Sequence, residues 1–290
     1  MNLPVQVEDL TLRYGATTAL DRLSLTLTAG KIYGLLGRNG SGKTSLLSVL
    51  AAFRRASGGA VRIGGEDPYE NPRITRQICL IRESGDVVAE RCHRVLAFAR
   101  RLRPHWDQAY AERLVERFGL PLRKQVGRLS RGQRSALGCV LGLASRAPLT
   151  MFDESHLGMD APSRYIFYEE LLRDYAAHPR TIIVSTHLIE EFGPLFEEVL
   201  IIDQGRLLAH DETDALRTRG AAIVGPDAAV DRFTSDLTVV TERRLGGTRS
   251  ATVDGPLTPA QRRRAEAEGL QVEPVPLQDL FVHLTNGGTE

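Results

Sequence analysis

The segment at residues 37–44 has the residue types that can bind a triphosphate. It reads GRNGSGKT, an apolar run at 32–36 precedes it, and residues 45–50 follow with helical spacing. Glycines allow successive backbone N–H groups to point at one anion, and a helix N-terminus adds the positive end of its dipole. The pattern G-x-x-x-x-G-K-[ST] between a strand and a helix therefore predicts a nucleotide-binding phosphate loop, against the alternative of a glycine-rich turn that matches by chance.

Within this loop, the lysine and the threonine have separate expected roles. Lys43 would reach the β- and γ-phosphates, and the hydroxyl of Thr44 would be a ligand of Mg²⁺. The positions that we expect to contact the nucleotide are Gly37, Asn39, Gly40, Ser41, Gly42, Lys43, Thr44 and Ser45.

Two later apolar runs end in residues that could act on the same nucleotide. Residues 149–152 are followed by Asp153 and Glu154, and His187 comes soon after residues 181–185. A carboxylate at the carboxyl end of a strand can hold Mg²⁺ beside a phosphate loop, which favours Asp153 as a metal ligand. Glu154 can polarise the attacking water as a general base, and His187 can hydrogen-bond the γ-phosphate. The alternatives are a capping role for the acidic pair and a structural role for the histidine.

A second helix start occurs at residues 129–133, which read LSRGQ. Ser130 and Gln133 have the spacing of a capping box, and Gly132 lies between them. Such a helix N-terminus is another place where an anion can bind. Because one nucleotide does not need two such helix starts, the second is expected to serve a nucleotide held by another subunit.

An aromatic turn, Tyr14-Gly15, separates two strand-like stretches at residues 5–12 and 23–27. Tyr14 could be a platform on which a purine base stacks, or an ordinary aromatic residue of a surface turn. Spacing alone leaves the two interpretations open.

The composition of the 290-residue chain is that of an ordinary globular protein, with 42% hydrophobic and 25% charged residues and a net charge of +1. This balance gives no overall attraction to nucleic acid, so no nucleic-acid partner is expected. No stretch approaches the roughly 18 apolar residues of a spanning helix, and the N-terminus lacks the pattern of a signal peptide. The cysteines are expected to be reduced and buried, which favours the cytoplasm: Cys79, Cys92 and Cys139.

Residues 82–128 change to helical spacing with many arginines. Val95, Phe98, Ala99 and Leu102 share one helix face. The segment has 11 Arg or Lys against 6 Asp or Glu, an excess of five positive charges. This predicts a helical insertion, whose basic surface could favour an anionic partner or a nearby membrane, or could simply be a solvated helix face.

Taken in order, these motifs resemble those of the nucleotide-binding subunit of ABC transporters, over roughly residues 3–218. Residues 37–44 resemble the Walker A motif, 129–133 the signature motif, and 149–154 the Walker B motif with its catalytic glutamate. Residues 158–160 resemble the D-loop, His187 the switch histidine and Tyr14 the stacking aromatic.

The resemblance implies an α/β fold with a RecA-like P-loop core, an antiparallel β portion and a helical subdomain at about residues 84–146. It implies ATP and Mg²⁺ as cofactors, and adds Asp160 to the nucleotide-binding residues. Two such subunits would pack head to tail around two ATP molecules, so that Ser130, Gly132 and Gln133 of one subunit contact the ATP on Lys43 of the other. The second subunit could be a copy of this chain or a related chain.

The function implied is ATP hydrolysis that drives a membrane permease on a separate chain, from the cytoplasmic face of the membrane. Residues 103–107 and 185–191 are similar to those of bacterial exporter subunits, with antibiotic and drug exporters nearest. The alternative is a regulatory ATPase that senses ATP and hydrolyses it weakly. A chromosome-type ATPase is disfavoured. Such proteins carry a long coiled coil between the phosphate loop and the signature motif, but only 87 positions separate Lys43 from Ser130 here.

Three departures from the family pattern occur. Glu83 stands where the family usually has glutamine, so it is a candidate both for catalysis and for binding Mg²⁺. Its negative charge near the γ-phosphate is expected to affect the rate of hydrolysis and its coupling to transport, but not ATP binding. Arg131 replaces the first signature glycine, and Ser155 and His156 replace a usual Pro-Thr pair. We interpret His156 as a neutral variation.

Residues 219–290 form a separate C-terminal segment. Short apolar runs alternate there with helical stretches in the order β-α-β-β-α-β, which predicts a small α+β module of the ferredoxin-like kind. Thr258 and Gln261 have the spacing of a capping box at a helix start. The segment has no catalytic constellation, so it could dimerise, regulate or cover the core.

Overall fold

The computed structural model describes residues 3–82 and 89–286 of the chain. It divides into two compact units: residues up to 187 with 200–210, and residues 188–199 with those from 211 on. The first unit contains all the motifs expected to bind the nucleotide. In the described ranges, none of the helices is both long and apolar enough to span a bilayer.

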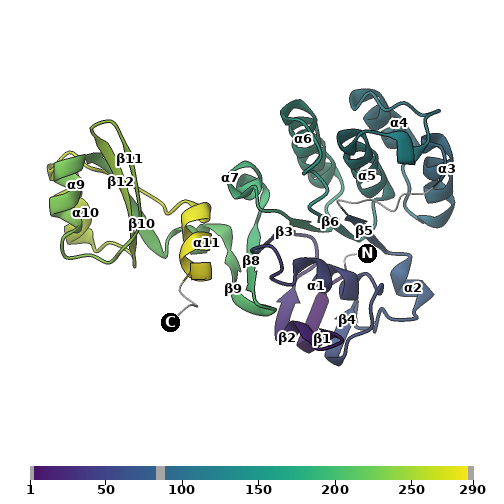
Figure 1. Cartoon of the computed structure of the whole chain (residues 1–290), viewed down its shortest axis with the longest axis horizontal. Coiled ribbons are helices and arrows are strands. Elements are labelled where there is room, and N and C mark those ends of the chain that lie inside the picture. Colours follow the sequence, from purple (N-terminus) through teal and green to yellow (C-terminus); the bar gives the residue numbers. More distant parts are fainter. Residues whose placement is uncertain (1–2, 83–88, 287–290) are drawn as a thin grey trace. The chain divides into compact units, whose positions relative to one another are not determined.

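A six-stranded sheet is the centre of the first unit (Figure 1). Its strands lie in the order β5-β6-β7-β3-β8-β9, and β5, β6, β7 and β3 pair in parallel. Parallel strands covered on both faces are almost entirely apolar, and β3, β6 and β7 are buried at every position. The bounds are β5 (Ile78–Arg82), β6 (Leu149–Asp153), β7 (Thr181–Ser185), β3 (Ile32–Leu36), β8 (Glu198–Asp203) and β9 (Arg206–Glu212).

Helices cover both faces of this sheet. Side chains alternate along a strand, so neighbouring residues of β6 face different helices. Met151 shares a core with Leu46 of α1 (Lys43–Leu50). The ring of Phe152 packs instead at Gly142 of α5 (Arg131–Ser145), and Figure 1 shows α1 and α5 on opposite sides of the strands.

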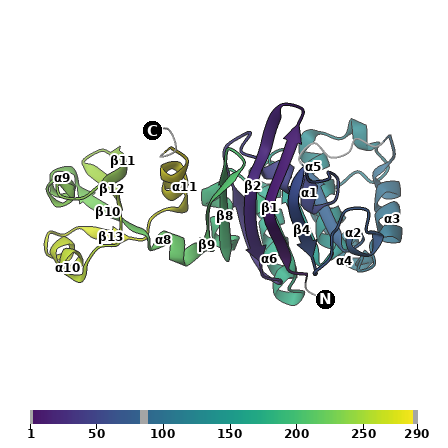
Figure 2. The ribbon, with the colours of Figure 1, turned by 90° about the horizontal axis from the view of Figure 1, so that it is seen from below.

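A three-stranded antiparallel sheet completes the core, in the order β2-β1-β4 (Figure 2). Buried and exposed side chains alternate in the first residues of β1 (Val5–Tyr14) and in the last of β2 (Thr17–Leu27), as expected for a sheet with one face on the core. The third strand is β4 (Gly58–Ile63), whose Ile63 lies opposite Val5.

The predicted helical insertion is present as α3 (Cys92–Leu102), α4 (Gln108–Arg117) and α5, with the short helices α2 (Pro72–Thr75) and η1 (Val126–Arg128) beside them in the chain. Ion pairs to a buried glutamate join it to α6 (Ala161–Ala177). Glu170 of α6 has no exposed surface and contacts Arg113 and Arg117 of α4. The three cysteines of the chain are free and buried, as predicted.

The second unit contains the expected β-α-β-β-α-β order and a sheet β11-β12-β10-β13, in which every described pairing is antiparallel. Thr258 and Gln261 form the predicted capping box. Buried Asp279 of the last helix accepts hydrogen bonds from Arg243 and Thr252, which fixes that helix to the sheet. The elements are α7 (Ile189–Phe192), η2 (Gly193–Leu195), α8 (Thr213–Arg217), β10 (Gly220–Pro226), α9 (Asp227–Thr234), β11 (Val239–Leu245), β12 (Thr248–Asp254), α10 (Pro259–Ala267), β13 (Gln271–Glu273) and α11 (Leu277–Asn286).

Candidate nucleotide-binding site

The phosphate loop connects the end of β3 to the start of α1, as the motif predicts. Two of its glycines lie where no side chain fits. A Cβ on Gly37 would lie 2.5 Å from the backbone oxygen of Ile202, and one on Gly42 would lie 2.7 Å from that of Ala19. Gly42 also has φ 108°, a conformation that favours glycine. Its place at the N-terminus of α1 leaves the first N–H groups of that helix available to an anion.

Lys43 is buried in the loop and points back at it. Its Nζ donates hydrogen bonds to the backbone oxygens of Gly37 (2.6 Å) and Arg38 (3.1 Å), and lies 3.9 Å from Oε1 of Glu154. Burial lowers the pKa of the ammonium, while the charges of Glu154 and Asp153 act in the opposite direction. A phosphate group here would replace the carbonyl oxygens as the acceptor of the Lys43 hydrogen bonds. Its negative charge would stabilise the buried ammonium.

Asp153 is the last residue of β6 and is buried. Within the described part of the chain, its Oδ1 has no hydrogen-bond partner. A buried carboxylate oxygen in this position fits a cation, because an unsatisfied buried acceptor costs free energy. Thr44 is the second residue of α1 and is exposed, so its hydroxyl is available as a second ligand.

Mg²⁺ in nucleotide sites is usually held by one or two protein groups together with phosphate oxygens and waters. The described residues contain no group of three or more His, Cys, Asp or Glu side chains that could hold a metal ion by themselves. The donor set of Thr44 and Asp153 therefore fits Mg²⁺ that arrives with a triphosphate. Glu83, the third expected ligand and a catalytic candidate, lies outside the described residues.

Glu154 and His187 lie in direct contact at the carboxyl ends of neighbouring strands. Nδ1 of His187 is 3.0 Å from Oε2 of Glu154, and the backbone N–H of Glu154 donates to Ser185 of β7. Burial raises the pKa of Glu154, against the opposing effects of His187 and Lys43. A carboxylate with a raised pKa is a better proton acceptor at neutral pH, which suits a general base.

The backbone of Glu154 has φ 50°, in the left-handed region that residues other than glycine rarely adopt. Such conformations cost free energy and concentrate at functional sites. The sequence pattern at 149–154 gave no sign of it, because nothing in the residue type of a glutamate indicates a left-handed turn.

His156, which we interpreted from the sequence as a neutral variation, makes a specific buried contact in the structure. It has no exposed surface, and its Nε2 shares a hydrogen bond of 2.9 Å with Oγ1 of Thr186, the residue before His187. Burial, with smaller effects of His187 and Arg164, lowers its pKa to about 3, so the ring is neutral. Sequence reasoning missed this contact, although the departure from the usual threonine at this position was a signal.

The signature-like start of α5 forms the predicted capping box. The N–H of Gln133 donates to Oγ of Ser130, and the N–H of Ser130 donates to Oε1 of Gln133, both at 3.2 Å. Gly132 packs so closely that an added Cβ would lie 2.8 Å from the oxygen of Gly158. Over the described residues, none of these three residues hydrogen-bonds the phosphate loop. The structure thus brings them together with one another and with the D-loop segment, and Ser130 remains exposed.

Two further expected contacts lie on exposed turns. Asp160 is the N-cap of α6, where its side chain accepts a hydrogen bond from the N–H of Ser163, and hydrogen bonds from the side chain and then the N–H of Ser163 lower its pKa. Tyr14 ends β1 with 42% of its surface exposed, and the guanidinium of Arg54 lies 5.6 Å from its ring centroid. An exposed ring with a cation on one face is able to stack on a base.

Comparisons with known proteins agree with this geometry. The family described as ABC transporter matches residues 20–156. The bacitracin transport ATP-binding protein of Bacillus licheniformis is 32% identical over 225 residues, which cover 76% of this chain and 73% of that protein. This chain belongs to the family of ABC transporter ATP-binding proteins. The daunorubicin resistance ATP-binding protein of Streptomyces coeruleorubidus is 29% identical to this ABC protein. The match covers 97% of this chain and 95% of the relative.

Solved structures give the same fold. The ATP-binding subunit of an ABC transporter matches 73% of the chain and 91% of its own length, with a TM-score of 0.66 and 24% identity. A dimeric ATP-binding cassette in a post-hydrolysis state with ADP and Pi matches 72% of the chain and 98% of its own, with a TM-score of 0.64 and 17% identity. The α/β fold, the ABC family and the assignment as a transporter ATPase subunit, as predicted from the motifs, are therefore confirmed.

Proposed function

We propose that this ABC ATPase is the motor subunit of an exporter whose transport path lies on a separate membrane permease. One observation carries the catalytic part: Lys43, Glu154 and His187 converge at the carboxyl ends of the parallel strands, with 3.0 Å between Glu154 and His187. The names of the relatives, which include bacitracin transport and daunorubicin resistance, support export as the direction.

The chain's own residues suit ATP hydrolysis. The N–H groups at the start of α1 and the ammonium of Lys43 would bind and orient the β- and γ-phosphates. Thr44 and Asp153 would hold Mg²⁺, which neutralises charge on the phosphates when it is bound. Glu154 would accept a proton from the attacking water, while His187 orients that carboxylate and can donate to the γ-phosphate.

A second subunit would complete each site. Ser130 and Arg131 at the start of α5 are exposed, beside the first N–H groups of that helix. None of the described contacts joins Ser130, Gly132 or Gln133 to the phosphate loop of the same chain. We infer that they serve the nucleotide of a partner subunit, either a second copy of this chain or a related ATPase. Asp160, on the exposed start of α6, would lie at the same subunit contact.

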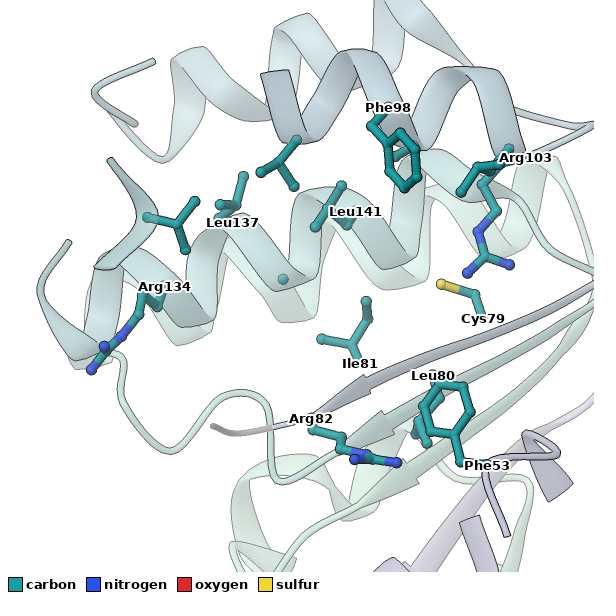
Figure 3. A pocket seen from close by; sticks show the side chains of 15 residues that line it. Phe53, Cys79, Leu80, Ile81, Arg82, Phe98, Arg103, Arg134, Leu137 and Leu141 are labelled. Carbon is teal, nitrogen blue, oxygen red and sulfur yellow. The ribbon is translucent and has the colours of Figure 1, made fainter. Parts of the chain in front are cut away.

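An apolar pocket of about 300 Å³ in the first unit is the proposed docking site for the permease (Figure 3). It lies between β5 and the helices α3 and α5. Phe53, Phe98 and Leu102 line it and remain 54%, 62% and 53% exposed, which is unusual for large apolar side chains. Arg82, Arg103 and Arg134 also line it.

The occupant that fits this pocket is an amphipathic helix of the permease with acidic residues at its edge. Its apolar side would cover Phe98 and Leu102, and its carboxylates would face the arginines. Pocket and catalytic strands are directly connected, because β5 pairs with β6 along its whole length and Arg82 lies opposite Asp153. Docking there would hold the ATPase at the cytoplasmic face of the membrane, and residues 219–290 would be an accessory module.

The test uses cells whose chromosomal copy of this chain is replaced by Phe98→Glu, with Leu172→Glu as a matched control. Like Phe98, Leu172 is an exposed apolar residue, at 39%, but it lies on α6 outside the pocket. Both purified variants should hydrolyse ATP like the wild type. Accumulation of bacitracin-type peptides and of daunorubicin-type drugs is measured in the cells.

We expect Phe98→Glu to abolish export of whichever compound the wild type exports, and Leu172→Glu to preserve it. Export by Phe98→Glu at the wild-type rate would contradict docking at this pocket. Purified wild-type protein with no ATP turnover would contradict the motor function itself, and would favour the ATP-sensing alternative that Glu83 suggests.

A further inference from the structure

The loop that carries His187 is anchored at the residue before it. Thr186 is fully buried, and its backbone N–H donates to the oxygen of Leu35, at the end of β3 next to the phosphate loop (3.3 Å). Its side chain shares the 2.9 Å hydrogen bond with Nε2 of His156. One contact therefore reaches toward the phosphate loop and the other reaches the segment after Glu154.

Among the described contacts, the side chain of His187 is held by its 3.0 Å contact with Glu154. Its side chain is 49% exposed, whereas His156 and Thr186 have no exposed surface. An exposed side chain keeps much of its rotamer freedom, so its contact with Glu154 depends on where the backbone places it, and the buried residues below fix that backbone. The strands alone do not fix the position of His187, because β6 and β7 end before it, at the paired residues Asp153 and Ser185.

We propose that His156 is a positioning residue for hydrolysis: through Thr186 it holds His187 in contact with Glu154. The inference rests on the proposed ATPase mechanism and adds a residue to it. The neutral imidazole suits this role, because it fills the space with a hydrogen-bonding group and adds no charge beside Glu154. Its pKa, lowered to about 3 by burial, keeps it neutral near pH 7.

The two side chains act as one unit, and this has a measurable consequence. If either partner is removed, the other loses the same contact, so the loss in turnover should occur once rather than twice. A displacement of about 1 Å at a catalytic group can cost on the order of a hundredfold in rate. A loop that moves by a fraction of that should lower kcat about tenfold, with ATP affinity unchanged because the phosphate loop is intact.

The experiment is a double-mutant cycle on the purified full-length chain. The variants are His156→Leu, Thr186→Val and the double variant, with His156→Gln to restore a hydrogen-bonding group. Thr150→Val is the matched control. Thr150 is fully buried in the neighbouring strand and donates to the oxygen of Ala147, so its loss destabilises the fold without touching the loop.

We expect both single variants and the double variant to show the same roughly tenfold loss of kcat, with unchanged KM, and His156→Gln to recover part of it. Thr150→Val should lower the melting temperature and leave kcat as it is. Additive losses in the double variant, wild-type kcat in Thr186→Val, or losses of kcat that follow the melting temperature across all variants including Thr150→Val would each overturn the proposal. A wild-type chain without ATPase activity would overturn both this proposal and the proposed function.

Discussion

Replacement of Gly37 by alanine should weaken ATP binding for a reason that can be measured from the structure. The new Cβ would lie 2.5 Å from the backbone oxygen of Ile202, whereas Cβ atoms essentially never approach a heavy atom within 3.0 Å. Because that oxygen belongs to β8, it cannot rotate away, and the loop must move by about the 0.5 Å between these two distances. Gly37 has no positive φ, so steric contact causes the effect: the added Cβ would also lie 2.3 Å from Oγ of Ser41, a side chain that can rotate, whereas the oxygen of Ile202 is backbone.

The magnitude follows from the hydrogen bonds that the loop makes. A shift of about 0.5 Å stretches an N–H···O bond from about 2.9 Å to about 3.4 Å, near the limit of bonding. Loss of one bond to a charged acceptor costs on the order of 1.5–3 kcal/mol. The Kd for ATP should therefore rise on the order of 10- to 150-fold.

The assay is a titration with a fluorescent ATP analogue in the presence of Mg²⁺, combined with thermal unfolding of each variant. Gly58→Ala is the matched control, because it makes the same change at a strand residue whose added Cβ would meet nothing closer than 3.8 Å. A Kd for Gly37→Ala equal to that of the wild type would refute the reasoning. So would an equal loss of affinity in Gly58→Ala.

Three further predictions concern packing, pH and the unusual glutamate. Gly142→Ala places a Cβ 2.5 Å from the ring of Phe152, and should lower the free energy of unfolding in urea by about 1–3 kcal/mol; unchanged stability would contradict the packing of α5 on β6. Burial raises the pKa of Glu154 above its ordinary value of 4.5, so the carboxylate takes up its proton earlier as the pH falls. The acidic limb of kcat/KM should then have its midpoint above pH 4.5, and a midpoint at or below that value would argue against Glu154 as the base. Glu83→Gln should leave ATP affinity unchanged and alter turnover, whereas identical turnover would show that Glu83 is not at the γ-phosphate.

The order of elements around the site could be predicted because its signals are local. The phosphate loop, the capping box at Ser130 and the apolar runs before Glu154 and His187 are each read within a few residues, and the structure has the strands and helices at those places. Strands buried on both faces are continuous apolar runs, so they stand out even without alternation.

The contacts between those elements could not be predicted in the same way. The hydrogen bond between His156 and Thr186 joins residues 30 positions apart, and it depends on the pairing of β6 with β7. The close approach of Gly142 to Phe152 depends on how α5 crosses the sheet, and the left-handed backbone of Glu154 on the turn after β6. None of these features leaves a pattern in neighbouring residues. The sequence did show that His156 stands where the family usually has threonine.

Glu154→Gln tests most directly whether two subunits pair around ATP. This variant should bind ATP but barely hydrolyse it, so that a complex completed by Ser130 of a second copy accumulates. Sedimentation velocity is measured with and without Mg-ATP, and Glu154→Gln combined with Lys43→Ala serves as the control that cannot bind. If two copies of this chain pair around ATP, a monomer becomes a dimer with Mg-ATP in Glu154→Gln alone. A protein that binds ATP with wild-type affinity and remains monomeric would contradict this pairing.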